Sequence, residues 1–254
     1  MPKPSVRHSA SRAADVPALA LQALTVALVM AQALAAPLPA LAGESAVVSE
    51  ILDGNELYID TRQARVKQKA SAPQEISTRN SRGQLSFDSG AAGRLNRFSQ
   101  IRLGSSCFLL SKGQVLVSGK QSGCTASSRL SVRGTNYVLE VGDDGASDLS
   151  VLEGSVEVEP LRDGVPSGEP PTTVQAGERL RLSPAGVVIA LLKLTSGDYD
   201  SILRGELFRD FSTPLPAFGS LESYIRSSVP GVSIPSLPAP SRPSIPTFGL
   251  PRFF

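Results

Sequence analysis

The sequence predicts an all-β fold, in which short antiparallel strands form a sandwich or a β-roll. Between positions 46 and 192, runs of about four to eight residues are apolar or alternate apolar with polar residues, as β-strands do. Turn-forming groups such as Asp-Gly-Asn and Ser-Lys-Gly separate these runs at short intervals. No amphipathic helix pattern comes between the runs, which argues against a parallel sheet with crossover helices. We therefore expect an all-β domain over residues 43–194.

Turn residues locate the early strands. Residues 46–60, AVVSEILDGNELYID, predict two strands joined by the Asp-Gly-Asn turn. Residues 84–104 place two alternating apolar positions on each side of a glycine-containing turn. Residues 107–119, CFLLSKGQVLVSG, have two apolar runs on either side of Ser-Lys-Gly, and this pattern predicts a β-hairpin.

Residues 133–160, RGTNYVLEVGDDGASDLSVLEGSVEVEP, show the strand pattern most clearly. Thr135, Tyr137, Leu139 and Val141 fall on one face, which predicts a strand buried on one side. A hairpin turn follows, because the acidic Asp-Asp-Gly segment lacks the regularly alternating oxygen ligands and final glutamate of a calcium loop. The apolar positions then change parity at Gly154, which predicts a bulge or a corner there.

The C-terminal part of the chain has a different composition. Residues 195–211, TSGDYDSILRGELFRDF, predict a short helix that Asp198 could cap and whose apolar face includes Leu203 and Leu207. Such a helix either closes an open end of the β core or binds a partner, and we favour the first interpretation. Residues 212–254 are rich in proline and serine and predict a disordered tail.

Residues 1–42 predict an export signal. Three basic residues precede an apolar stretch from about residue 18 to residue 36, and Ala-Leu-Ala at positions 40–42 fits the small-residue cleavage pattern. We expect cleavage between Ala42 and Gly43, and a periplasmic or secreted product. The alternative is an uncleaved signal that anchors the chain, which would be its sole contact with a membrane.

The charge balance argues against nucleic-acid binding. Residues 1–42 hold three basic residues and Asp15, and without them the chain has 22 basic and 22 acidic residues. A nucleic-acid partner would call for a basic surface. Residues 43–133 hold 13 basic and 7 acidic residues, whereas residues 134–211 hold 6 basic and 14 acidic ones. We expect these opposite charges to pair across neighbouring strands, with a two-signed docking surface as the alternative.

Cys107 and Cys124, the two cysteines of the sequence, predict a disulfide, because an exported chain meets an oxidising compartment. Free thiols are the alternative. The loop-closure model gives such a bridge roughly 3 kcal/mol.

The residues that catalytic sites commonly use are missing. The single histidine, His8, lies in the predicted signal, so the exported chain has neither a histidine-activated nucleophile nor a histidine metal ligand. No phosphate-binding or dinucleotide-binding glycine loop is present. We therefore expect no enzymatic activity, no cofactor and no metal site, and we assign no catalytic residue.

Five segments, in order, resemble the FecR-type domain. Residues 77–103 are similar to its polar strand and turn, LLSKGQVLVSG to its leucine-rich hairpin, and LSVRGTNYVLEV to its Gly-Thr signature, with Tyr137 at the aromatic position. LSVLEGSVEVEP and TTVQAGERLRLSPAG are similar to its later strands. The resemblance covers residues 64–187. It implies an extracytoplasmic β module that senses or relays, the name-giving member linking an outer-membrane siderophore receptor to a sigma factor. It also implies that the Gly134-Thr135 pair is structural and marks a tight approach where the backbone enters a buried strand. Gly134 would supply a conformation without a side chain, and Thr135 a start compatible with a β-strand.

The resemblance and the residues together predict a non-enzymatic module that binds or relays through a protein partner in the cell envelope. About 17 residues precede the apolar stretch, too few for a folded sigma-binding segment, so direct control of a sigma factor is not expected. The alternative is an adhesive or glycan-binding envelope protein, although the sequence has no tryptophan to stack on sugars.

Overall fold

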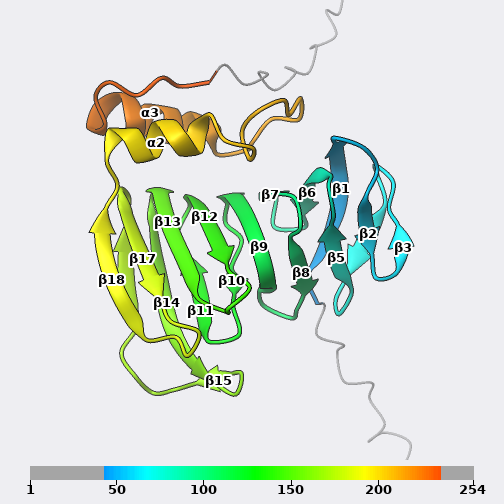
Figure 1. The fold of residues 1–254 in the computed structure, drawn as a ribbon, viewed down its shortest axis with the longest axis horizontal. Coiled ribbons are helices and arrows are strands. Elements are labelled where there is room, and N and C mark those ends of the chain that lie inside the picture. Colours follow the sequence, from blue (N-terminus) through cyan, green and yellow to red (C-terminus); the bar gives the residue numbers. More distant parts are fainter. Residues whose placement is uncertain (1–42, 236–254) are drawn as a thin grey trace, which may run out of the picture. The chain divides into compact units, whose positions relative to one another are not determined.

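The structure is a computed structural model that describes residues 43–235. The predicted signal, residues 1–42, and the end of the predicted tail, residues 236–254, lie outside the described residues. The described chain is all-β, as predicted: 18 strands are followed by two helices (Figure 1).

Antiparallel pairing builds two sheets that share one long strand. The first sheet contains, in spatial order, β4 (Lys69–Ser71), β1 (Ser45–Leu52), β6 (Arg82–Phe87), β7 (Ala92–Leu95), β9 (Phe108–Gly119), β12 (Thr135–Val141), β13 (Ser147–Glu153), β17 (Glu178–Leu182) and β18 (Val188–Lys193).

The second sheet begins and ends with short strands. It contains, in spatial order, β3 (Arg62–Gln63), β2 (Leu57–Ile59), β5 (Glu75–Thr78), β8 (Gln100–Leu103), β9, β10 (Gly123–Cys124), β11 (Ser128–Val132), β14 (Ser155–Arg162) and β16 (Thr172–Gln175), with β15 (Val165–Pro166) on the far end of β14. The pairing of β9 with β10 is parallel.

The main core lies between the two sheets, and the predicted inner face of residues 135–141 lies in it. The expectation that this strand is buried on one side only is wrong, because Asn136 and Val138 on its other face are buried as well, beneath the helices described below. Tyr137 and Leu139 of β12 and Val151 of β13 are buried in it, together with Val156 of β14. The polar end of Tyr137 stays satisfied because its hydroxyl donates to the carbonyl of Gln121 at 2.9 Å. Burial raises the pKa of this hydroxyl far above its ordinary value.

The predicted corner at Gly154 is also present. Gly154 joins β13 in the first sheet to β14 in the second, and its φ is +82°. A Cβ there would lie 2.7 Å from the carbonyl oxygen of Gly134, so glycine is required for both conformation and space. Gly134 itself has a positive φ of 60°, but no atom lies within 4 Å of its Cβ position. The close approach predicted at Gly134 and Thr135 is therefore present, but the residue that must be glycine to allow it is Gly154, whereas Gly134 supplies the backbone conformation.

Residues 107–119 do not form the predicted hairpin. They form β9, one continuous strand whose first half pairs in the second sheet and whose second half pairs in the first sheet. The strand changes sheets at Gly113, where φ is +85° and a Cβ would lie 2.5 Å from the Cα of Ser99. The glycine thus permits a bend within one strand rather than a reversal of the chain.

The predicted helix over residues 195–211 is shorter in the structure. Helix α2 spans Ser196–Leu203, and its N-cap is Thr195 rather than Asp198, which forms the second half of a capping box with Thr195. Irregular turns follow from Arg204 to Asp210. The helix ends there because Gly205 has a poor helix propensity and because buried arginines bind the carbonyls of the following turns, as described below.

The prediction of a disordered tail from residue 212 is wrong for its described part. Helix α3 spans Phe218–Ser228 and lies beside α2 across one end of β9, β12 and β13 (Figure 1). Leu221 and Ile225 are buried on the inner side of α3. A second apolar cluster joins both helices to the outer face of the first sheet, including Leu116, Val138 and Leu152. The helices therefore form a third layer and cover part of the sheet rather than an open end of the core.

Candidate interaction surface

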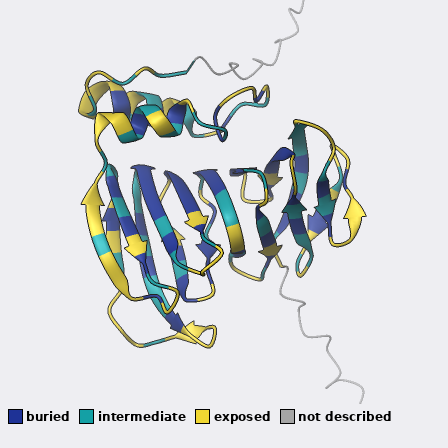
Figure 2. Cartoon of the chain, in the orientation of Figure 1, coloured by how far each residue is buried: buried dark blue, intermediate teal, exposed yellow. Residues whose placement is uncertain are grey.

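Strand β18 forms an apolar and exposed edge of the first sheet. It pairs with β17 on one side, and none of the described strands pairs with it on the other. Five apolar side chains at this edge are about half exposed or more: Val187 64%, Val188 47%, Ile189 60%, Leu191 47% and Leu192 48%. Figure 2 shows β18 as largely exposed beside the buried strands of the same sheet.

Both faces of β18 are apolar. Leu191 lies opposite Leu180 and shares its inner face, while Leu192 lies opposite Arg179 on the outer face. The register shifts between Arg181 and Leu182, which makes Ile189 the extra residue of a β-bulge. A regular strand therefore runs from Ala190 to Lys193, and its backbone donors and acceptors on the free side are open to a further strand.

The one charged residue of β18 is already neutralised. The Lys193 ammonium lies 2.6 Å from the Glu178 carboxylate. This hydrogen bond, together with one from the backbone of Gln175, holds the pKa of Glu178 below its ordinary value. Lys193 thus protects only the end of the strand, and no proline interrupts its free edge.

The other edges of the two sheets are short or polar. The first sheet ends at β4 with the exposed Lys69 and Ser71. The second sheet ends at the two-residue β3 and at β16, in which Thr173 and Gln175 are exposed. Among the sheet edges within residues 43–235, β18 is therefore the apolar one.

Two arginines are buried on the outer face of the first sheet, where they fasten the connector, which we define as residues 204–217 between α2 and α3. Arg94 of β7 is 0% exposed. Its guanidinium donates to the side chain of Gln84 at 2.8 Å, to the carbonyl of Leu207 at 3.1 Å and to that of Thr213 at 2.9 Å. It also lies 4.2 Å from the ring centre of Phe211. Burial lowers the pKa of Arg94 to about 10, so the guanidinium stays charged at neutral pH.

Arg82 of β6 is 1% exposed and binds the same connector. It donates to the carbonyls of Glu206 and Arg209 and forms an ion pair with Asp53. The hydrogen bond from Arg82 lowers the pKa of Asp53 below its ordinary value. The Arg97 guanidinium lies 2.7 Å from the Asp53 carboxylate and 2.6 Å from the Glu206 carboxylate. These ion pairs link the turn after β1 to the connector.

Glu50 of β1 anchors the far end of the connector. Its carboxylate accepts hydrogen bonds from the backbone of Ser212 and Thr213, both at 2.8 Å, and from the Ser212 hydroxyl at 2.7 Å. Burial opposes ionisation of Glu50, but these hydrogen bonds outweigh it and lower its pKa.

A polar groove lies between α2 and the outer face of the first sheet. Two adjoining hollows of about 180 and 220 Å³ share Gln114, Val138, Arg179 and Ile202. Two ion pairs line the groove: Arg179 with Asp198 at 3.5 Å, and Arg181 with Asp148 at 3.0 Å. The carboxylate of Glu140, also in the lining, accepts a hydrogen bond from the side chain of Gln114 at 3.1 Å.

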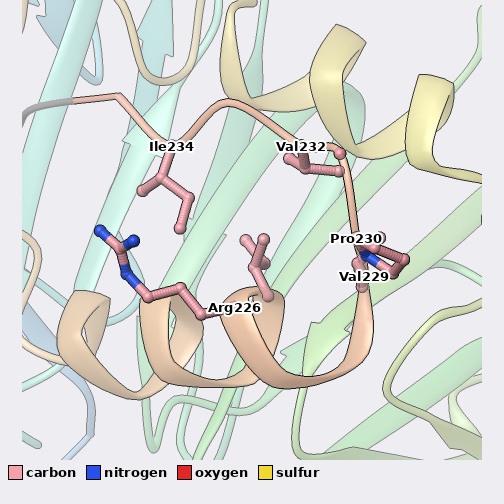
Figure 3. Close-up of a pocket in the computed structure, with 7 residues that line it drawn as sticks. Arg226, Val229, Pro230, Val232 and Ile234 are labelled. Carbon is pink, nitrogen blue, oxygen red and sulfur yellow. The ribbon is translucent and has the colours of Figure 1, made fainter.

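A second hollow of about 460 Å³ lies between α3 and the segment that follows it. In Figure 3 the side chains of Arg226 and Ile234 extend into this space, with Val229, Pro230 and Val232 around it. Arg226 is paired with Glu222 at 2.6 Å on the same helix. Apart from Gly231, the other residues that line this hollow have aliphatic side chains, and the paired Arg226 is its one charged residue.

The site residues predicted from the sequence fall in different places. The disulfide between Cys107 and Cys124 is present and ties the start of β9 to β10. Of the predicted cleavage pair, Ala42 lies outside the described residues and Gly43 is exposed. The predicted pairing of opposite charges is seen where Arg129 of β11 lies opposite Glu159 of β14.

The sequence does not predict two features of this surface. The apolar run VVIALL, residues 187–192, predicts one more short strand, but nothing in it distinguishes an edge strand from a central one. The buried arginines alternate with the inward residues of β6 and β7, which is also the pattern of a solvated face. The connector carbonyls that they bind lie more than 100 residues away along the chain.

Within residues 43–235, neither helix is long and apolar enough to cross a bilayer. The same part of the chain holds no cluster of three or more His, Cys, Asp or Glu side chains that could bind a metal ion.

A comparison with protein-family models and with curated proteins gives no match. Among solved structures, the fold is similar to two crystal structures of a protein from Parabacteroides distasonis ATCC 8503 described as a "putative anti-sigma factor". Each aligns with a TM-score of 0.38 and 17% sequence identity, over 47% of this chain and 59% of that protein. The match thus spans less than two thirds of the length of that protein.

Proposed function

We propose that this protein is a non-enzymatic, extracytoplasmic module of FecR type that binds or relays through protein contacts, and that the free edge of β18 is its contact surface. The observation that carries this proposal is the apolar, half-exposed and unprotected edge formed by residues 187–192. Natural sheets usually blunt such an edge with charges, proline or a covering element.

The chemistry of the edge defines the kind of partner. An added strand would gain backbone hydrogen bonds along Ala190 to Lys193, and its apolar side chains would cover Leu191 and Leu192. The surface therefore fits a protein strand with apolar side chains on both faces. A sugar partner is less favoured, because the exposed residues of this edge include no aromatic ring and no free hydrogen-bonding side chain.

Two further observations support an extracytoplasmic location. Both cysteines of the sequence are consumed in one disulfide, a bond that persists in oxidising compartments. The N-terminal 42 residues have the charge and apolar pattern of an export signal.

A photo-crosslinking amino acid at position 189 tests the contact surface. Ile189 is 60% exposed and sits on the bulge, so the probe can reach an added strand without disturbing the core. We expect ultraviolet light to trap a protein adduct in envelope fractions of cells that express the full-length chain. Band mass and peptide sequencing would identify the trapped strand and show whether it comes from a second copy of the chain or from another protein.

The matched control is the same probe at Val165, which is equally exposed at 60% but lies on β15 at the end of the second sheet. An adduct at position 189 and none at position 165 supports the proposal. Equal adducts at both positions, or no adduct at position 189, would contradict it. Retention of the chain on purified envelope polysaccharide in that case would favour the glycan-binding alternative.

A further inference from the structure

We infer that the free edge of β18 pairs antiparallel with β18 of a second copy of this chain, in a twofold-symmetric contact centred on Leu191. This inference rests on the function proposed above and names the partner of that surface. It follows from the apolar faces of the strand, from its register and from its charges.

The two faces of β18 favour its own sequence as partner. A strand that joins this edge meets the apolar Leu191 on the inner face and the apolar Ala190 and Leu192 on the outer face. Most edge strands are apolar on one face only, so they would leave polar side chains against one of these faces. A second β18 presents apolar side chains to both.

A twofold axis perpendicular to the sheet fixes the register. Such an axis keeps each side chain on its own face, so a residue can lie opposite itself or opposite a residue two positions away. With Leu191 opposite its own copy, Ala190 lies opposite Leu192, and the whole regular segment is paired. The bulge at Ile189 then falls at the end of the contact, opposite Lys193 of the second copy.

Charge does not oppose this contact. No like charges face each other in this register, and Lys193 is already paired with Glu178 of its own chain. The nearest arginines on the outer face, Arg179 and Arg181, are likewise paired with Asp198 and Asp148. Two copies can therefore approach without an unpaired charge in the contact.

A second copy would bury apolar side chains that a single copy leaves exposed. The second sheet ends at β16, and Leu191 and Val188 remain 47% exposed although Leu191 shares the inner face of the buried Leu180. A second copy would bring its own Leu191 and Val188 over the same open flank. The contact would be small, so we expect a micromolar rather than a nanomolar affinity.

The chain's own C-terminal residues are a poor alternative occupant. Residues 236–254 contain prolines at positions 238, 240, 243, 246 and 251. Each proline lacks the N–H that a strand ladder needs, so this segment cannot continue the sheet over the length of β18.

Cysteine crosslinking in the full-length protein tests the register. In an antiparallel pair, residues directly opposite have Cα atoms about 4.5–5.5 Å apart, within the range that a disulfide spans. The Leu191→Cys variant should therefore form a disulfide-linked dimer on mild oxidation. Ala190→Cys is the matched control, because in this register its copy lies two positions away, beyond about 7 Å. Val165→Cys controls for random collisions and for exchange with the native disulfide.

Sedimentation equilibrium between about 1 and 300 μM tests the contact itself, because a micromolar association is visible in that range. We expect a reversible dimer in the native chain. Leu191→Lys would set two ammonium groups opposite each other and should weaken the association at least about tenfold. Val165→Lys, at an exposed site away from β18, should leave it unchanged. Circular dichroism verifies folding, and Leu192→Lys on the outer face replaces Leu191→Lys if that variant does not fold.

The outcomes separate this inference from the proposed function. A dimer that needs an apolar residue at position 191 and crosslinks there supports both. A monomer at every concentration, or a dimer unaffected by lysine at positions 191 and 192, overturns the second copy as partner. If the probe at Ile189 still traps a different protein, the proposed function stands without the dimer; if it traps nothing, both fail.

Discussion

Two regions of the first sheet differ in which kind of side chain they bury: the face beneath the connector buries charged side chains, whereas the β18 edge exposes apolar ones. At β6 and β7, two charged arginines are fully buried under residues 204–217. At β18, a row of aliphatic side chains remains half exposed. Burying two guanidinium groups without hydrogen-bond partners would destabilise the fold, and here the chain itself supplies those partners. Strand β18 has a neighbouring strand on one side only, so its other side is free to bind.

This difference separates stability from binding. The side chains that bind the connector should contribute to the free energy of unfolding, because their loss leaves buried polar groups without hydrogen-bond partners. Residues at the β18 edge should matter for association, because they contribute little to the fold of a single copy. Four measurements can sharpen or break this contrast.

The largest expected effect is at Arg94. In Arg94→Met, the side chain of Gln84 and the carbonyls of Leu207 and Thr213 lose their donor, so the free energy of unfolding should fall by about 3 kcal/mol. Urea denaturation measures the change. Arg226→Met on the exposed face of α3 is the control and should change stability by less than about 0.5 kcal/mol. A similar small effect at Arg94 would show that the connector is not held by this side chain.

A smaller loss is expected at Glu50. Glu50→Gln keeps one acceptor oxygen but removes the charge that accepts from Ser212 and Thr213, and it should cost about 1 kcal/mol. Hydrogen exchange should speed up at the amides of those two residues. Unchanged exchange there, with β12 equally protected, would contradict an anchoring role for Glu50.

Acid should loosen the connector before the sandwich. Hydrogen bonds and ion pairing lower the pKa values of Glu50 and Asp53 in the folded chain. Their stabilising contribution is therefore complete above the unfolded pKa values, about 4, and is lost as the pH falls through the lower folded values. Hydrogen exchange at low pH should show loss of protection in residues 204–213 while β12 stays protected. Simultaneous loss in both segments would break the contrast.

The smallest effect is expected at the open edge. Leu192→Thr, measured at a concentration where the chain is monomeric, should change the free energy of unfolding by no more than about 0.5 kcal/mol. A loss above about 1.5 kcal/mol would mean that this side chain belongs to the fold of a single copy. Leu180→Thr, on the neighbouring strand and fully buried, is the matched control and should cost several-fold more.

Local patterns predicted part of this structure. The shared inner face of Tyr137 and Leu139 and the corner at Gly154 follow from residue parity, because a strand alternates its faces whatever surrounds it. These two patterns lie within a few residues of the structure that they predict. The disulfide follows instead from an even number of cysteines behind a predicted export signal.

Other features depend on distant residues and could not be read locally. Proline and serine are frequent after residue 212, and this composition predicted disorder although Phe218, Leu221 and Ile225 have the spacing of a helix within α3. The burial of Arg82 and Arg94 could not be predicted locally, because the connector carbonyls that they bind come from the other end of the domain. The apolar run of β18 fits a central strand as well as an edge strand, and only the order of strands in the sheet makes it an edge.

The passage of β9 from one sheet to the other has a practical consequence for dissecting this protein. Every route between the early and late strands of the first sheet crosses the second half of β9, which pairs with β7 on one side and β12 on the other. A fragment that stops before β9, or begins after it, would expose β7 or β12 along its full length. The basic and acidic halves of the sequence are therefore not separable modules. Their boundary in composition near Arg133 is a poor place to divide the gene for expression of either part.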